Sequence, residues 1–137
     1  MNNSNLIALA KQFGSPLYVY DTAIISAQYH KLKSAFENVK NIKINYAVKA
    51  LSNISILAFL KDLGSGLDTV SIQEVELGLK AGFSPNKIIF TPNGVSLEEI
   101  ESAAKKGVKI NIDNLSILEQ FGTKYPNIPV CVRINPH

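Results

Sequence analysis

A repeated alternation of short apolar runs and helix patterns constrains this chain more than any other feature. The runs are rich in Ile and Val, most begin about 21 residues apart, and they lie at residues 42–48, 66–70, 87–91, 108–112 and 129–134. They are apolar at most positions, which is typical of strands covered on both faces in a parallel sheet. The chain is therefore predicted to be an α/β protein with five parallel strands.

Four helix patterns fill the intervals between the runs, at residues 53–63, 71–82, 96–107 and 114–122. Ser71 with Glu74, and Ser96 with Glu99, have the spacing of a capping box, which marks a helix start. A glycine at the end of each pattern predicts its stop, at Gly64, Gly82, Gly107 and Gly122. The predicted inward residues are Ile56, Leu57, Leu60 and Leu63 in the first helix and Leu115, Leu118 and Phe121 in the last.

The first 40 residues precede the repeat and are predicted to form a separate region, residues 1–40, ahead of the barrel residues 41–137. Residues 15–21 have the apolar character of a strand, which is a candidate for pairing in a separate β-domain. Residues 22–36 form a helix pattern whose apolar stripe is Ile25, Tyr29, Leu32 and Phe36. We therefore expect an N-terminal strand and helix that lead into the repeat.

Polar residues follow every predicted strand, and their positions distinguish between two architectures. They are Lys49, Asp68, Ser71, Thr91, Asn93, Asp113, Asn114, Arg133 and Asn135. Ligands bind at the carboxyl ends of strands in both architectures, but a doubly wound sheet concentrates its site at one switch point. Since every strand contributes here, the pattern favours a (β/α)8 barrel. A complete barrel needs eight strands and roughly 250 residues, so we expect the front part of a longer protein.

Composition excludes several classes of protein. Apolar residues make up 46% of the chain and the net charge is +3, which argues against disorder. No apolar run reaches the roughly 18 residues of a membrane span, and the basic residues are scattered rather than gathered on a nucleic-acid-binding face. Cys131 is the single cysteine, which excludes a disulfide framework and a multi-cysteine metal site and favours a reducing, cytoplasmic compartment. The sequence shows no other cluster of metal ligands, and we expect no nucleic-acid or membrane partner. Within its apolar run Cys131 is predicted to be a core residue.

Lys49 is the first candidate for chemistry. It closes an apolar run, and burial there would favour the neutral amine that Schiff-base chemistry needs. By position alone, a lysine that extends from a strand end into water is the simpler interpretation. Asp68 closes the next run, and across a barrel mouth its carboxylate would face Lys49 and hold a substrate ammonium. A loop aspartate ahead of a helix explains Asp68 equally well.

Arg133 lies inside the last apolar run, so it is predicted either to point into the barrel or to be buried against the other face. A buried guanidinium needs an anionic partner, and Asp68 or a phosphate would serve. Glu74, Asp113 and Asn114 are already explained as helix-capping residues. His30 is expected on the surface of its helix.

Two segments that hold Lys49 and Asp68, residues 46–50 and 64–71, resemble the pyridoxal-phosphate decarboxylases of the alanine-racemase-like barrel fold. Further similar segments lie at residues 14–21, 74–77, 81–83, 87–90 and 133–136. The resemblance extends over nearly the whole chain in the family's order and spacing. It departs at Leu51, where the family commonly has asparagine. It implies part of a (β/α)8 barrel of pyridoxal-phosphate fold type III.

The resemblance also implies pyridoxal 5'-phosphate as cofactor, a small amino acid as substrate and a homodimer as assembly. Lys49 would be the Schiff-base lysine, Asp68 and Arg133 would line the cofactor site, and Glu74 would help to orient them. The implied reaction is the decarboxylation of meso-2,6-diaminopimelate to L-lysine, the last step of lysine biosynthesis. Alternatives are decarboxylation of ornithine, arginine or carboxynorspermidine, and a non-catalytic fragment, because other family site residues are expected beyond this chain.

Overall fold

A computed structural model describes residues 2–134 and 136 of the chain. It divides into two compact units, Met1–Lys40 and Asn41–His137. We call the first the N-terminal unit and the second the barrel unit.

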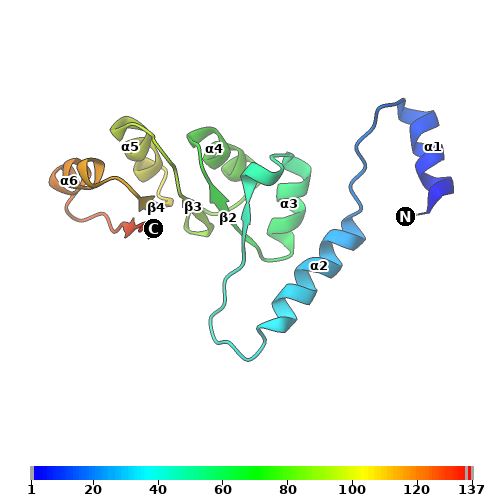
Figure 1. The fold of residues 1–137 in the computed structure, drawn as a ribbon, viewed down its shortest axis with the longest axis horizontal. Coiled ribbons are helices and arrows are strands. Elements are labelled where there is room, and N and C mark those ends of the chain that lie inside the picture. Colours follow the sequence, from blue (N-terminus) through cyan, green and yellow to red (C-terminus); the bar gives the residue numbers. More distant parts are fainter. Residues whose placement is uncertain (1, 135, 137) are drawn as a thin grey trace. The chain divides into compact units, whose positions relative to one another are not determined.

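The N-terminal unit contains two helices, α1 (Asn3–Phe13) and α2 (Thr22–Ala35) (Figure 1). Asn2 caps α1 and Asp21 caps α2, because each side chain accepts a hydrogen bond from a backbone N–H of the first turn. Neither helix contains a buried residue. The predicted helix over residues 22–36 is confirmed within one residue, whereas α1 had no counterpart in the sequence prediction.

The strand predicted over residues 15–21 is wrong. Residues 15–20 belong to no helix or strand, and Asp21 is the cap of α2. A strand needs a neighbouring strand to pair its backbone N–H and C=O groups. All strand pairs of the described residues lie in the barrel unit, and residues 15–20 take part in none of them.

The barrel unit alternates strands and helices in the predicted order (Figure 1). The strands are β1 (Asn45–Ala47), β2 (Gly66–Thr69), β3 (Ile88–Phe90), β4 (Lys109–Ile112) and β5 (Cys131–Val132). The helices are α3 (Ile54–Asp62), α4 (Ile72–Lys80), α5 (Leu97–Lys105) and α6 (Leu115–Lys124), with short 3-10 turns η1 (Val48–Ala50) and η2 (Pro85–Lys87). All strand pairs are parallel, which confirms the predicted sheet.

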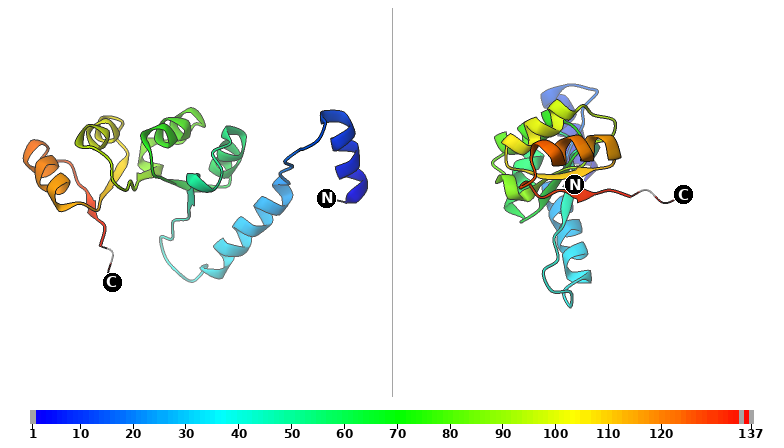
Figure 2. Two further views of the ribbon diagram at one scale, coloured as in Figure 1. Left: turned by 45° about the horizontal axis from the view of Figure 1, so that its top comes forward. Right: turned by 90° about the vertical axis from the view of Figure 1, so that its left-hand side faces the viewer.

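The order of the strands in space identifies the architecture. The five strands neighbour one another in sequence order, β1-β2-β3-β4-β5, so the order never reverses as it does at the switch point of a doubly wound sheet. The four helices α3 to α6 lie on one side of the strands (Figure 2). Consecutive β/α units with helices on one side form the wall of a barrel, as predicted.

The core lies between the strands and these helices. Alternate strand residues face the helices and are almost completely buried, among them Leu67, Ile88, Phe90, Ile110 and Ile112. The helices contribute Leu57, Val75, Ile100, Ala103 and Phe121 to the same cluster. Gly78 lets α4 approach the sheet closely, because a Cβ atom there would lie 2.6 Å from Leu67 Cδ1.

Several details of the predicted helices and core need correction. Helix α6 continues past the predicted stop at Gly122 to Lys124. Leu115, predicted to face inward, is 80% exposed because it opens the helix on its outer side, while Phe121 is buried as predicted. Cys131 is exposed rather than part of the core. The described residues after β5 form no helix that would cover it.

Candidate functional site

Three polar side chains from consecutive strands form a hydrogen-bonded row on the sheet face opposite the helices. The hydroxyl of Thr91 donates to Asp68 Oδ1 at 2.7 Å, and Asn111 Nδ2 donates to Thr91 Oγ1 at 2.9 Å. All three are half-buried. Because strand side chains alternate between faces, their position follows from the burial of Leu67, Phe90 and Ile110 on the helix side.

Lys49 lies at the same edge of the sheet as this row. Ala47, the last residue of β1, is the register partner of Asp68 in β2, and Lys49 follows two residues later in η1. The structure therefore brings the sequence positions of Lys49 and Asp68 together, as predicted for a barrel mouth. Lys49 is exposed beyond the end of β1, as in the simpler of the two interpretations, a lysine that extends from a strand end into water. None of the ion pairs found among the described residues involves Lys49.

Glu74 acts on the backbone that connects β2 to α4. Its Oε2 atom accepts a hydrogen bond from the Val70 N–H at 2.8 Å, and the Glu74 N–H donates to Ser71 Oγ at 3.2 Å. In the capping box predicted here the glutamate would bond the N–H of Ser71, so the observed bond is shifted by one residue. The effect is to hold the turn directly after Asp68 and Thr69. At Ser96 both bonds of the predicted box are present.

Arg133 follows β5 and is exposed in the structure. Its backbone N–H donates to the Ile112 carbonyl at 2.8 Å, which extends the β4–β5 ladder by one residue. In register, Cys131 pairs with Asn111, which places position 133 near the carboxyl end of β4. Asn135, the other polar residue predicted to follow the last strand, lies outside the described residues.

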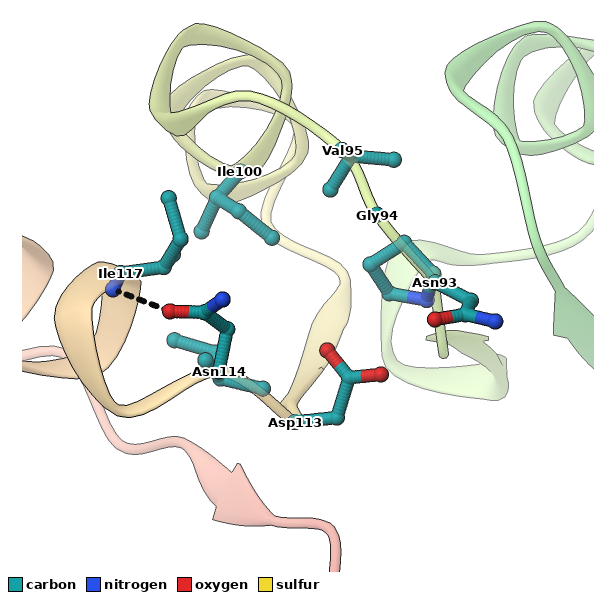
Figure 3. Close-up of a pocket in the computed structure, with 9 residues that line it drawn as sticks. Asn93, Gly94, Val95, Ile100, Asp113, Asn114 and Ile117 are labelled. Atoms are coloured by element: carbon teal, nitrogen blue, oxygen red, sulfur yellow. Dashed lines mark hydrogen bonds between the residues drawn. The ribbon is translucent and has the colours of Figure 1, made fainter.

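A pocket of about 230 Å³ opens between the loops that follow β3 and β4 (Figure 3). Its polar lining includes Asn93 and Asp113, and its apolar wall is formed by Val95, Ile100 and Ile117. Asn114 also lines it, but its Oδ1 atom caps α6 by accepting from the Ile117 N–H at 3.1 Å. The pocket extends the polar edge away from Lys49, along the carboxyl ends of the later strands.

Sequence reasoning named Asp68 and Thr91 but missed Asn111. The signal was present, because an amide between Ile110 and Ile112 must face away from the side on which both isoleucines are buried. No group of three or more His, Cys, Asp and Glu residues suited to a metal ion is found within residues 2–134 and 136. No helix in the described part of the chain is long and apolar enough to cross a membrane.

Comparison with known proteins identifies the family of this chain. A family model described as the pyridoxal binding domain of pyridoxal-dependent decarboxylases matches residues 22–137. The chain belongs to this family. The match includes every strand and helix of the barrel unit, and the row of polar residues at its carboxyl edge.

Individual relatives agree with the family assignment. The chain is 35% identical to diaminopimelate decarboxylase of Methanothermobacter thermautotrophicus, over 99% of this chain and 32% of the relative. It is 38% identical to the enzyme of the same name from Helicobacter pylori strain J99, over 97% of this chain and 34% of the relative. The chain thus spans about a third of the length of these curated relatives.

Solved structures share the fold. Diaminopimelate decarboxylase from Helicobacter pylori, complexed with L-lysine, superposes with a TM-score of 0.82 at 35% identity, over 96% of this chain and 33% of that one. Lysine/ornithine decarboxylase from Vibrio vulnificus, complexed with putrescine, gives a TM-score of 0.85 at 30% identity, over 96% and 36%. The barrel unit is therefore part of a (β/α)8 barrel.

The residues at the edge fit the pyridoxal phosphate that the family binds. A Schiff base with its aldehyde requires a primary amine, and among the described residues of the barrel unit Lys49 is the only lysine within two residues after the end of a strand. Other lysines, such as Lys43, Lys87 and Lys109, precede or open strands and so belong to the opposite edge. Asp68, Thr91 and Asn111 add a carboxylate, a hydroxyl and an amide beside it. This donor set suits a polar, charged cofactor.

Proposed function

We propose that this protein is a pyridoxal-phosphate-dependent amino-acid decarboxylase in which Lys49 is the Schiff-base lysine. The observation that carries the proposal is the position of Lys49, two residues past the register partner of Asp68, at the carboxyl edge of a parallel barrel sheet. Ligands of barrel enzymes bind at this edge. When bound, pyridoxal phosphate supplies an electron sink for the pair released as the substrate loses carbon dioxide.

The side chains of this chain take the following roles in the proposal. Lys49 Nζ holds the cofactor between turnovers and can carry a proton to or from the reacting carbon when it is displaced. The Asp68 carboxylate holds positive charge on the bound amine beside it. Glu74 keeps the turn after β2 in place through its bond to the Val70 N–H. Arg133 offers its guanidinium to an anionic group such as a phosphate.

We propose meso-2,6-diaminopimelate as the substrate and L-lysine as the product. The support is that curated relatives over nearly the whole chain are named diaminopimelate decarboxylases. The similarity to lysine/ornithine decarboxylase favours a second candidate, a diamino acid without the distal carboxylate. We further propose that the working protein is a cytoplasmic homodimer, which light scattering of the purified protein would test.

Reductive trapping tests the role of Lys49. The protein, purified at its native length, is incubated with pyridoxal phosphate and reduced with borohydride, and peptides are analysed by mass spectrometry. We expect the pyridoxyl group on Lys49, with loss of labelling and activity in Lys49→Arg. Lys43→Arg, at the other end of β1, is the matched control and should keep both. Labelling that spreads evenly over surface lysines would refute the assignment.

Carbon dioxide release tests the substrate. Purified protein is supplied in turn with meso-2,6-diaminopimelate, ornithine, lysine, arginine and carboxynorspermidine. We expect the largest kcat/KM for meso-2,6-diaminopimelate. A preference for ornithine or lysine would replace the substrate while leaving the reaction class in place, and no release from any of the five would refute the proposed activity.

A further inference from the structure

The row formed by Asp68, Thr91 and Asn111 has a fixed direction of hydrogen bonding. A threonine hydroxyl has one proton to donate. Because Asn111 Nδ2 donates to Thr91 Oγ1, that proton is left for Asp68, whose Oδ1 atom lies 2.7 Å away. The amide of Asn111 therefore fixes the orientation of the Thr91 hydroxyl, and the hydroxyl fixes the orientation of the Asp68 carboxylate.

The backbone makes this arrangement rigid. The Thr91 N–H donates to the Thr69 carbonyl at 2.7 Å, which extends the β2–β3 ladder to Thr91 itself. Asp68 lies in the same ladder, opposite Ile89. Threonine is branched at Cβ, so its side chain has few alternative rotamers in a strand. The three side chains are half-buried, where such bonds are stronger than in open water.

The bond to Thr91 turns one carboxylate oxygen of Asp68 toward β3. The side chain of Asp68 has no other hydrogen bond or ion pair among the described residues. Its second oxygen, Oδ2, is thus available for a ligand, and β1, which leads into Lys49, is the strand on the other side of β2 from Thr91. An isolated aspartate at a strand end would rotate about its side-chain bonds, whereas this one is held.

We propose that Thr91 and Asn111 are positioning residues that orient the Asp68 carboxylate toward the group bound at Lys49. The inference rests on the proposed function, because it concerns the same site. The two residues act through Asp68, and they need not touch the cofactor or the substrate. Removing the Thr91 hydroxyl should leave Lys49 reactive but make the site bind and turn over its ligand poorly.

The test compares Thr91→Val with Thr91→Ser, which keeps the hydroxyl. We expect Thr91→Val to weaken pyridoxal phosphate binding, measured by absorbance titration, about tenfold, and to lower kcat more than it raises KM. Thr91→Ser should restore both to within about threefold of the unsubstituted protein. Asn111→Asp should resemble Thr91→Val, because it presents the hydroxyl with a second acceptor in place of a donor.

Thr69→Val is the matched control for loss of a hydroxyl. Thr69 is adjacent to Asp68 but fully buried on the helix side, where its hydroxyl donates to the Ile89 carbonyl at 2.9 Å. We expect it to lower the melting temperature with little effect on cofactor binding. Equal losses of cofactor binding in Thr69→Val and Thr91→Val would mean that Thr91 has only a structural role, and would overturn the inference. Unchanged cofactor binding in Thr91→Val would also overturn it.

Borohydride labelling of Lys49 separates this inference from the proposed function. If the unsubstituted protein is not labelled at Lys49, the proposed function fails and the positioning role fails with it. If the unsubstituted protein is labelled and Thr91→Val binds the cofactor equally well, only the positioning role fails. The expected result is labelling of Lys49 in both proteins, with Thr91→Val requiring about tenfold more pyridoxal phosphate.

Discussion

The N-terminal unit and the barrel unit contain the same kinds of residue but use them differently. In the barrel unit Phe90, Leu67 and Val75 are completely buried between sheet and helices. In the N-terminal unit, α1 and α2 have N-caps like those of the barrel helices. Phe13 is nevertheless 64% exposed and Tyr18 is 87% exposed. Capping and periodicity therefore specify a helix locally, whereas a core requires several elements whose apolar faces meet.

The largest expected effect comes from making the same change in both units. Phe90→Ala should lower the free energy of unfolding by about 3–5 kcal/mol, because it opens a cavity in the core. Phe13→Ala should change it by less than about 0.5 kcal/mol, since the side chain is mostly in solvent. Urea titration of the purified protein measures both. A large effect of Phe13→Ala would mean that another surface covers α1, and would contradict the view that Phe13 is not part of a core.

A smaller effect is expected from removing one cap in each unit. Asn53 accepts from the N–H groups of Ser55 and Ile56 at 3.0 and 3.2 Å, and Asp21 accepts from those of Ala23 and Ile24 at 3.0 and 3.4 Å. Substitution of either capping residue by alanine should destabilise its helix by about 1 kcal/mol.

The two cap variants should differ in how far the damage spreads. α3 buries Ile56, Leu57 and Leu60, so Asn53→Ala should lower global stability. α2 contains no fully buried residue, so Asp21→Ala should raise hydrogen exchange roughly fivefold in α2 alone. Exchange followed by mass spectrometry distinguishes the two. A global shift in Asp21→Ala would contradict the view that α2 stands apart from a core.

The smallest expected effect concerns the surface of the barrel unit. Lys124 on α6 donates to Glu101 on α5 at 2.6 Å, and this hydrogen bond raises the pKa of Lys124 above its ordinary 10.5. A raised folded pKa stabilises the fold below pH 10.5, and the contribution is lost as the pH rises through the folded value. The difference in melting temperature between the unsubstituted protein and Glu101→Gln should therefore be slightly smaller at pH 11 than at pH 9. No difference in melting temperature between the two proteins at pH 9 would show that the pair contributes nothing.

The elements that could be predicted from sequence are those with a local cause. Capping signals at Ser71, Ser96 and Asn114 located three helix starts, and the repeated apolar runs predicted five parallel strands that alternate with helices. Errors occurred where an outcome depended on neighbours. Residues 15–20 lie outside any helix or strand although they are apolar enough for a strand, and Cys131 is exposed although it lies in an apolar run.

The candidate site divides in the same way. The carboxyl edge that carries Lys49 and Asp68 follows from strand direction, which sequence supplies. The exposure of Lys49 and Arg133 depends on what packs against them, which sequence does not supply. The link from Asn111 through Thr91 to Asp68 depends on the register between strands about 20 residues apart, and it became visible only once the register was known.

The strictly sequential strand order also bears on how the barrel unit folds. Asn45 pairs with Gly66, Leu67 with Ile88, Ile89 with Lys109 and Asn111 with Cys131, so each new strand joins one made only about 20 residues earlier. Loops of that length are inexpensive to close, and closing them requires nothing from distant parts of the chain. At roughly 5–20 residues per second on the ribosome, a further β/α unit becomes available every few seconds. The wall of this barrel can therefore grow one unit at a time while the chain is still being synthesised.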